Sequence, residues 1–154
     1  MGWTEFHRRQ DVLSAVLWQA RRNPRGPLPF AEVPGAAEVF GTEQELLLAL
    51  QHKWNRLLSG YLCAAVGDPW EVGAGAVWRD VDLIGAVSAA WRSAAVDHPT
   101  LRAVLDAHGR APVLTELREA EQRLLAVASG LAGPADPTGG ANATYDAVLH
   151  HRAG

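Results

Sequence analysis

The fold is decided by the stretch Phe40-Gly41-Thr42-Glu43-Gln44-Glu45-Leu46-Leu47-Leu48-Ala49-Leu50, which predicts the start of a long helix. Thr42 can cap the helix, and Glu45 can reach back to the amide of the cap residue, as in a capping box. Apolar side chains then recur at intervals of three and four as far as Val66. That period is typical of one helix face, so we predict a helix over about 42–66.

Intervals of three and four also separate apolar residues in the rest of the chain, which predicts helices and no strands. A first helix is expected over about 4–22, with Thr4 as its cap and Phe6 on its inward stripe. Three more are expected over about 77–96, 99–108 and 112–131, and Pro99 suits the first turn of its helix. The predicted fold class is therefore all-α, a single-domain helical bundle of about five helices.

Two segments interrupt the helical pattern. Between 24 and 41 the chain carries four prolines and several glycines, which leave no room for a long helix and predict a Pro/Gly-rich connector. From Gly133 onward Gly, Pro, Ala and Asp dominate, and we predict a flexible tail over 133–154. The expected organisation is one helical domain over 1–132 followed by this tail.

Composition bounds the compartment and the partners. The chain has 154 residues, a formal net charge of -3, a pI of about 6.0 and a single cysteine, Cys63. One cysteine excludes an intrachain disulfide framework, and we expect Cys63 to be a small buried hydrophobic residue. We find neither a secretory signal nor an apolar run of the roughly 20 residues that would span a bilayer. The expected localisation is cytoplasmic, with no membrane partner.

Sequence motifs of catalysis and metal binding are not found. The chain contains no Glu-x-x-His pair, no Gly-rich phosphate loop and no Gly-x-Ser-x-Gly elbow. His7 and Asp11 lie four residues apart, but two ligands do not make a metal site. We therefore predict no enzyme activity, no catalytic residue, no metal site and no cofactor.

Other polar residues receive structural interpretations. His108 precedes Gly109, where a histidine favours a helix C-terminus, and His52 is the histidine expected nearest the interior. Glu121 and its charged neighbours on the last long helix are expected on a solvated outer face.

The six tryptophans are the unusual feature of the composition. Trp54 and Trp91 fall on inward stripes, where core packing is the simpler interpretation and the lining of a ligand cavity is the alternative. Polar neighbours such as His52 could orient a ligand there. The predicted ligand-binding residues are Trp54, His52, Leu58, Tyr61 and Trp91.

Two short motifs resemble the TetR family of repressors. Phe40-Gly41-Thr42 with Leu46-Leu47-Leu48-Ala49 is similar to the stretch that opens the fourth helix of that family, and Ala90-Trp91 with Asp97-His98-Pro99-Thr100-Leu101-Arg102 is similar to the middle of its regulatory domain. Two departures stand against a DNA-binding head: Glu43 replaces a lysine, and 35–40 is too short for a recognition helix. The resemblance implies an all-helical regulatory domain, commonly dimeric, that binds a small apolar ligand between its helices, with the DNA-binding head reduced or lost.

Three functions follow from these observations. The leading hypothesis is a non-enzymatic, TetR-like binding or regulatory domain with an apolar ligand cavity, forming a homodimer through Leu117 and Leu124 of the last long helix. The first alternative is a DNA-binding regulator whose compact N-terminal head uses the arginines Arg8, Arg9, Arg21, Arg22 and Arg25. The second alternative is a metal- or haem-binding helical bundle that uses His52 or His7. With a net charge of -3 and Glu43 in a phosphate-contact position, DNA is not expected as a partner.

Overall fold

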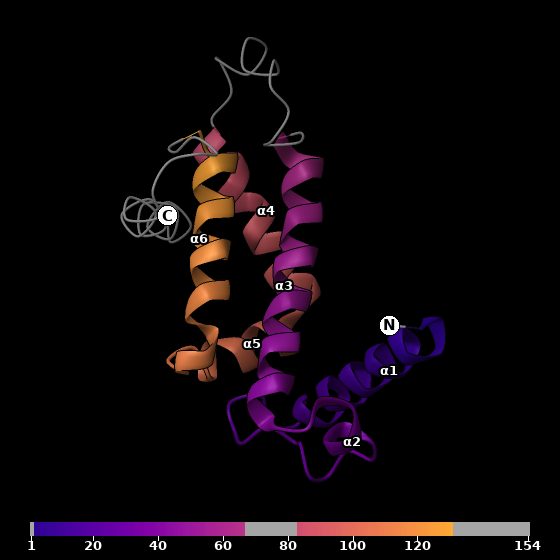
Figure 1. Cartoon of the computed structure of the whole chain (residues 1–154). Helices are drawn as coiled ribbons and strands as arrows, with labels where there is room; N and C mark the ends of the chain where they lie inside the picture. Colours follow the sequence, from indigo (N-terminus) through magenta and orange to yellow (C-terminus); the bar gives the residue numbers. More distant parts are fainter. Residues whose placement is uncertain (1, 67–82, 131–154) are drawn as a thin grey trace. The chain divides into compact units, whose positions relative to one another are not determined.

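The protein is described by a computed structural model over residues 2–66 and 83–130 (Figure 1). In these ranges the chain forms six α-helices and one short 3-10 helix, and no strand. The elements are α1 (Trp3–Ala20), α2 (Ala36–Phe40), α3 (Glu43–Val66), α4 (Leu83–Asp97), α5 (Pro99–Ala107), η2 (Pro112–Leu114) and α6 (Thr115–Ala128). The prediction of an all-α fold is confirmed.

These helices group into two compact units. The first contains the described residues of 2–54 and 98–115, which form α1, α2, the first half of α3, α5 and η2. The second contains the described residues of 55–97 and 116–130, which form the rest of α3, α4 and nearly all of α6. A single domain over 1–132 stays a prediction, and the predicted tail over 133–154 lies outside the described residues.

The start of α3 follows the predicted cap. The backbone N–H of Glu45 donates to the hydroxyl oxygen of Thr42 at 3.2 Å, which satisfies one of the amides that the first turn leaves without a partner. Glu43 and Glu45 lie in the first turn, where negative charge suits the helix dipole. The helix predicted over about 42–66 is therefore confirmed almost to the residue.

The first helix differs from its prediction at the N-terminus. Its N-cap is Gly2, with no hydrogen bond from a cap side chain, so Thr4 lies inside the helix and the prediction of Thr4 as the cap was wrong. Phe6 is 38% exposed, so it was wrongly placed on the inward stripe. The face of α1 that packs carries Val12, Leu13, Val16 and Ala20, and Phe6 lies to one side of it.

The connector over 24–41 is mostly irregular and holds one short helix, α2. Gly35 begins it with a φ of 88°, a left-handed conformation that glycine adopts without strain. Although the connector is rich in proline, its apolar side chains Leu28, Val33 and Phe40 are buried. The connector is therefore part of the core of the first unit.

A buried arginine lies in the core of that unit. Arg102 on α5 is 7% exposed, and its guanidinium carbon lies 4.6 Å from the centre of the Trp54 ring. The guanidinium also pairs with the carboxylate of Asp106 one turn later, at 2.8 Å from Nη2 and 3.0 Å from Nε. Stacking and pairing offset part of the cost of burying this charge.

In the second unit a buried carboxylate departs from the prediction. Glu121 on α6 is 4% exposed, and one of its oxygens lies 3.5 Å from the indole nitrogen of Trp91 on α4, which donates to it. The expectation of a solvated Glu121 was therefore wrong. A buried indole N–H needs an acceptor, and Glu121 supplies one.

Further contacts join α3 to the other helices of this unit. The side-chain amide of Asn55 donates to the backbone carbonyl of Leu117 at 3.0 Å.

Cys63, expected to be buried, is exposed, so that expectation was wrong. None of the helices in the described ranges is long and apolar enough to cross a membrane.

Candidate functional site

The five predicted ligand-binding residues divide between the two units. His52 and Trp54 belong to the first, while Leu58, Tyr61 and Trp91 belong to the second. Trp54 and Leu58 are wholly buried, Trp91 is nearly so, and Tyr61 is partly exposed. His52 is exposed, so the expectation that it lies near the interior was wrong. A cavity shared by these residues stays a prediction.

Tyr61 has a polar role within the second unit. Its hydroxyl donates a hydrogen bond to the carboxylate of Asp97, at the end of α4. That hydrogen bond, with smaller contributions from desolvation and from the charge of Asp97, raises the pKa of Tyr61 above its ordinary value of 10.0. The phenol therefore stays protonated to a higher pH in the folded protein than in the unfolded chain.

An alkaline titration should show this effect. We expect one of the two tyrosines to ionise above pH 10.0 in the folded protein, and the Asp97→Asn variant to bring that transition down toward 10.0. Since the folded pKa is raised, the stabilisation is complete below pH 10.0 and is lost as the pH rises through the folded value. Absorption of the phenolate measures the titration, and Tyr61→Phe assigns it. Two tyrosines that both titrate at the ordinary value would contradict the expectation.

A pocket of about 440 Å³ lies within the first unit, and we call it the His108 pocket. Three segments line it: the connector, the first turns of α3, and the segment from the end of α5 into η2, which we call the α5–η2 turn. The apolar lining residues are Leu28, Leu47, Ala111, Pro112 and Val113, and the polar ones are Glu43, Gln44 and His108. The aliphatic walls at Leu28 and Leu47 are buried side chains, 7% and 5% exposed.

Local structure explains how these segments meet. Pro27 and Pro29 restrict the backbone on both sides of Leu28 and favour an extended conformation there. On α3, Leu47 lies one turn after Glu43 and Gln44, so the three share one side of the helix. Gly109 follows the end of α5, and the chain turns there before η2 begins at Pro112. The local sequence of each segment therefore explains the backbone conformation of the pocket wall that it forms.

His108 is the lining residue with a hydrogen-bonded ring nitrogen. Its Nδ1 lies 2.9 Å from the backbone carbonyl oxygen of Val104. A carbonyl oxygen only accepts hydrogen bonds, so Nδ1 carries a proton and donates it. In the neutral ring Nε2 is then an acceptor. This contact also agrees with the predicted role of His108 at a helix C-terminus, but the prediction did not include the pocket.

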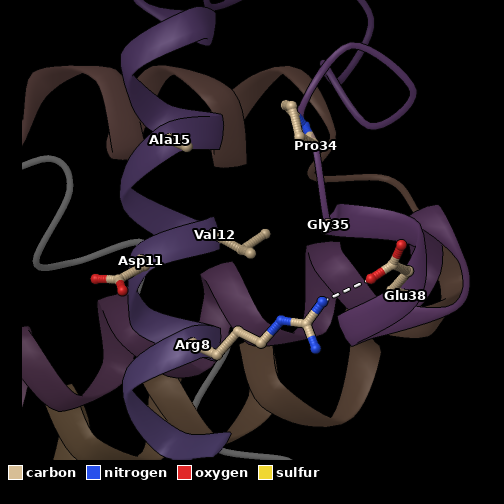
Figure 2. A pocket seen from close by; sticks show the side chains of 7 residues that line it. All are labelled: Arg8, Asp11, Val12, Ala15, Pro34, Gly35 and Glu38. Carbon is tan, nitrogen blue, oxygen red and sulfur yellow. Dashed lines mark hydrogen bonds and ion pairs between the residues drawn. The ribbon is translucent and has the colours of Figure 1, made fainter. Parts of the chain in front are cut away.

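A second pocket, of about 450 Å³, lies between α1 and α2 (Figure 2), and we call it the Arg8 pocket. Figure 2 shows the Arg8 side chain reaching from α1 to Glu38 on α2, and the two groups pair at 2.6 Å. Val12 projects from α1 into the space between the two helices. The residues that line the Arg8 pocket are Arg8, Asp11, Val12, Ala15, Pro34, Gly35 and Glu38.

The His108 pocket is the better candidate for a binding site. In the Arg8 pocket the paired side chains are 57% and 73% exposed, and exposed ion pairs contribute at most about 1 kcal/mol. Ligand sites in proteins typically have apolar walls with a few polar groups that fix orientation, and the His108 pocket has this composition.

Over residues 2–66 and 83–130, no three His, Cys, Asp or Glu side chains come together as a group that could hold a metal ion. No family model, curated protein or solved structure matches the chain.

Proposed function

We propose that this chain is a non-enzymatic helical binding domain of the cytoplasm, and that its ligand is a small, mainly apolar molecule carrying one hydrogen-bond donor. The observation that carries the proposal is the His108 pocket, in which aliphatic walls converge with a histidine whose Nδ1 is already engaged. The ligand's apolar body packs against Leu28, Leu47 and Val113, and its donor group faces Nε2 of His108.

Size and chemistry support this assignment. A volume of about 440 Å³ lies within the range of roughly 300–1,000 Å³ found for small-molecule sites. The carboxylate of Glu43 and the amide of Gln44 are exposed side chains of the lining, and both can accept a hydrogen bond. A hydroxyl or amine on the ligand therefore meets acceptors on the polar side, whereas a ligand carboxylate would meet the charge of Glu43.

The resemblance to the TetR family supports a regulatory role for the binding. The pocket draws together the connector, α3 and the α5–η2 turn, so a bound ligand would stabilise one arrangement of these three segments.

We also propose a homodimer through α6, where Leu117 and Leu124 are only half-buried. A light-scattering mass at micromolar concentration tests that part directly.

The DNA-binding alternative has less support. Of its five arginines, Arg8 pairs with Glu38, Arg9 lies over the ring of Phe40 at 4.8 Å, and Arg21 lies over the ring of Trp18 at 3.6 Å. The carboxylate of Glu38 pairs with Arg8, and residues 36–40 form only the five-residue helix α2, which is too short for a recognition helix. These two observations favour the ligand proposal.

A thermal-shift screen tests the proposed function. We expect hydroxylated or amino-bearing apolar compounds to raise the melting temperature of the full chain, and their analogues lacking the donor to raise it less. At a ligand concentration of about 100 times Kd the stabilisation amounts to roughly 2.7 kcal/mol. The variant His108→Phe keeps a ring of similar size without Nε2, and it should lose most of the shift.

The matched control is His52→Phe, which changes a histidine that is exposed and does not line the His108 pocket. It should respond to the compounds as the wild type does. A screen without any stabilising compound, or an equal response from His108→Phe and the wild type, would contradict the proposal.

A further inference from the structure

Large hydrophobic side chains are exposed mainly on one helix. Among the described residues, the exposed large hydrophobics are Trp3, Phe6, Trp18 and Val96, and three of these four belong to α1. Trp3 is 76% exposed and Trp18 is 64% exposed. Tryptophan is highly buried on average, so two side chains this exposed on one helix make α1 the strongest candidate for an interaction surface in the described part of the chain.

The two tryptophans share the outer side of α1. They are fifteen residues apart, which at 100° per residue leaves them about 60° apart around the helix axis and about 22 Å apart along it. Val12 and Val16, which are buried, lie on the opposite side. We call Trp3, His7, Trp18 and Arg21 the α1 outer face, and Phe6 lies at its edge, next to buried Leu13. The inner side of α1 contacts α2 and α5, so the outer face can bind without disturbing that packing.

Contacts within this face hold its aromatic rings in place. Trp3 stacks with Phe6 at a centroid distance of 6.4 Å and meets His7 edge-on at 4.3 Å. At the other end, the guanidinium of Arg21 lies 3.6 Å from the centre of the Trp18 ring. Such contacts order exposed side chains before a partner arrives, which lowers the entropy lost on binding.

Charge identifies the kind of partner. Residues 2–26 contain five arginines against the two carboxylates Glu5 and Asp11, a formal net charge of +3, in a chain whose total is -3. Arg21, Arg22 and Arg25 are exposed at the end of α1 and just beyond it. Arg8 is paired with Glu38, so the positive charge available to a partner comes mainly from Arg21, Arg22 and Arg25 beside Trp18, and this cluster suits an anionic surface.

We propose that the α1 outer face docks on the anionic surface of a lipid bilayer, with α1 lying in the plane of the interface. Tryptophan and phenylalanine favour the boundary between headgroups and acyl chains, and arginine binds lipid phosphates. An 18-residue helix, about 27 Å long, carries an aromatic group near each end and can lie flat. The proposal differs from the expectation, drawn from the sequence, that the chain has no membrane partner.

A single-stranded nucleic acid is the other anionic surface to which aromatic and basic side chains bind. Its bases stack on open aromatic faces. Here Arg21 covers one face of Trp18, while Phe6 and His7 crowd the ring of Trp3. The rings offer edges and partly covered faces, an arrangement better suited to insertion among lipid headgroups than to base stacking.

Co-sedimentation of the full chain with vesicles tests the proposal. One set of vesicles is phosphatidylcholine alone, and the other is phosphatidylcholine and phosphatidylglycerol in equal amounts. We expect sedimentation with the second set, little with the first, and release by added salt. The double variant Trp3→Ala/Trp18→Ala should bind at least about tenfold more weakly. Replacing Arg21 or Arg22 by glutamine should weaken binding about fivefold for each arginine.

The matched control is the double variant Val96→Ala/Arg92→Gln, which removes an exposed hydrophobic residue and an exposed arginine from α4. It should bind as the wild type does, and far-ultraviolet circular dichroism should show all the variants folded. The proposal is overturned by equal binding to both vesicle sets, by no binding, or by full binding of a folded Trp3→Ala/Trp18→Ala variant. Binding to a single-stranded oligonucleotide that requires the two tryptophans, without vesicle binding, would assign the face to nucleic acid instead.

Discussion

Replacing Trp54 by alanine is expected to lower the free energy of unfolding by about 3–5 kcal/mol, the range found when large aromatic residues are truncated in a protein core. Trp54 has no exposed surface, and Arg102 lies over its ring at 4.6 Å. The truncation leaves a void and removes the aromatic partner of a buried guanidinium group. Urea denaturation followed by circular dichroism measures the loss.

Trp18→Ala is the matched control. Trp18 also carries an arginine over its ring, at 3.6 Å, but it is 64% exposed, so its removal should cost less than about 1 kcal/mol. Equal losses in the two variants would contradict the assignment of Trp54 to the core.

The Trp54→Ala variant also distinguishes two possible positions of the bound ligand. A compound that stabilises both the wild type and His108→Phe, but not Trp54→Ala, would place the ligand near Trp54, as the sequence predicts. A compound that stabilises the wild type and still stabilises Trp54→Ala, but not His108→Phe, would place it in the His108 pocket.

Local signals in the sequence were sufficient to predict most of the helices. The hydroxyl of Thr42 and the amide of Glu45 are three residues apart, so the start of α3 depends on neighbours in the chain. Pro99 likewise occupies the first turn of α5, because a residue without an N–H is tolerated there. The burial of Trp54, Leu58 and Leu62 follows from their spacing along one helix. These features need no knowledge of distant contacts.

Features that depend on distant partners were missed. Glu121 lies among charged residues on α6, and its sequence neighbours indicate a solvated face. Its burial depends on the indole N–H of Trp91, thirty residues away in the chain. His52 has the opposite outcome, since it lies between buried Gln51 and Trp54 and is nevertheless exposed. Spacing along a helix gives the direction in which a side chain points around the helix axis. It does not show which distant part of the chain packs against that side chain.

The candidate site was missed for a related reason. The His108 pocket takes its lining from three separate segments, and one of them is a proline-rich connector without helical periodicity. Periodicity identifies helix faces, so the sequence predicted a ligand site at Trp54 and Trp91, which lie on inward faces. Leu28 between two prolines, and a histidine just after the end of a short helix, give no shared signal in the sequence.

Replacing Arg102 by alanine is expected to lower the free energy of unfolding by about 2–3 kcal/mol, through lost packing of its stem and lost charge-assisted hydrogen bonds. The side chain is 9% exposed, and it fills space over the Trp54 ring while pairing with Asp106. The variant Arg102→Met keeps much of that stem and removes the buried charge, so it should cost clearly less than alanine.

Arg110→Ala is the control for this series, because Arg110 is exposed and lies in the turn after α5. It should change stability by less than about 0.5 kcal/mol. Chemical denaturation of the three variants orders their costs. If Arg102→Met costs as much as Arg102→Ala, the stabilisation comes from the charge and its pairing with Asp106. If the methionine variant is as stable as the wild type, the arginine acts in this core as an apolar stem that covers Trp54.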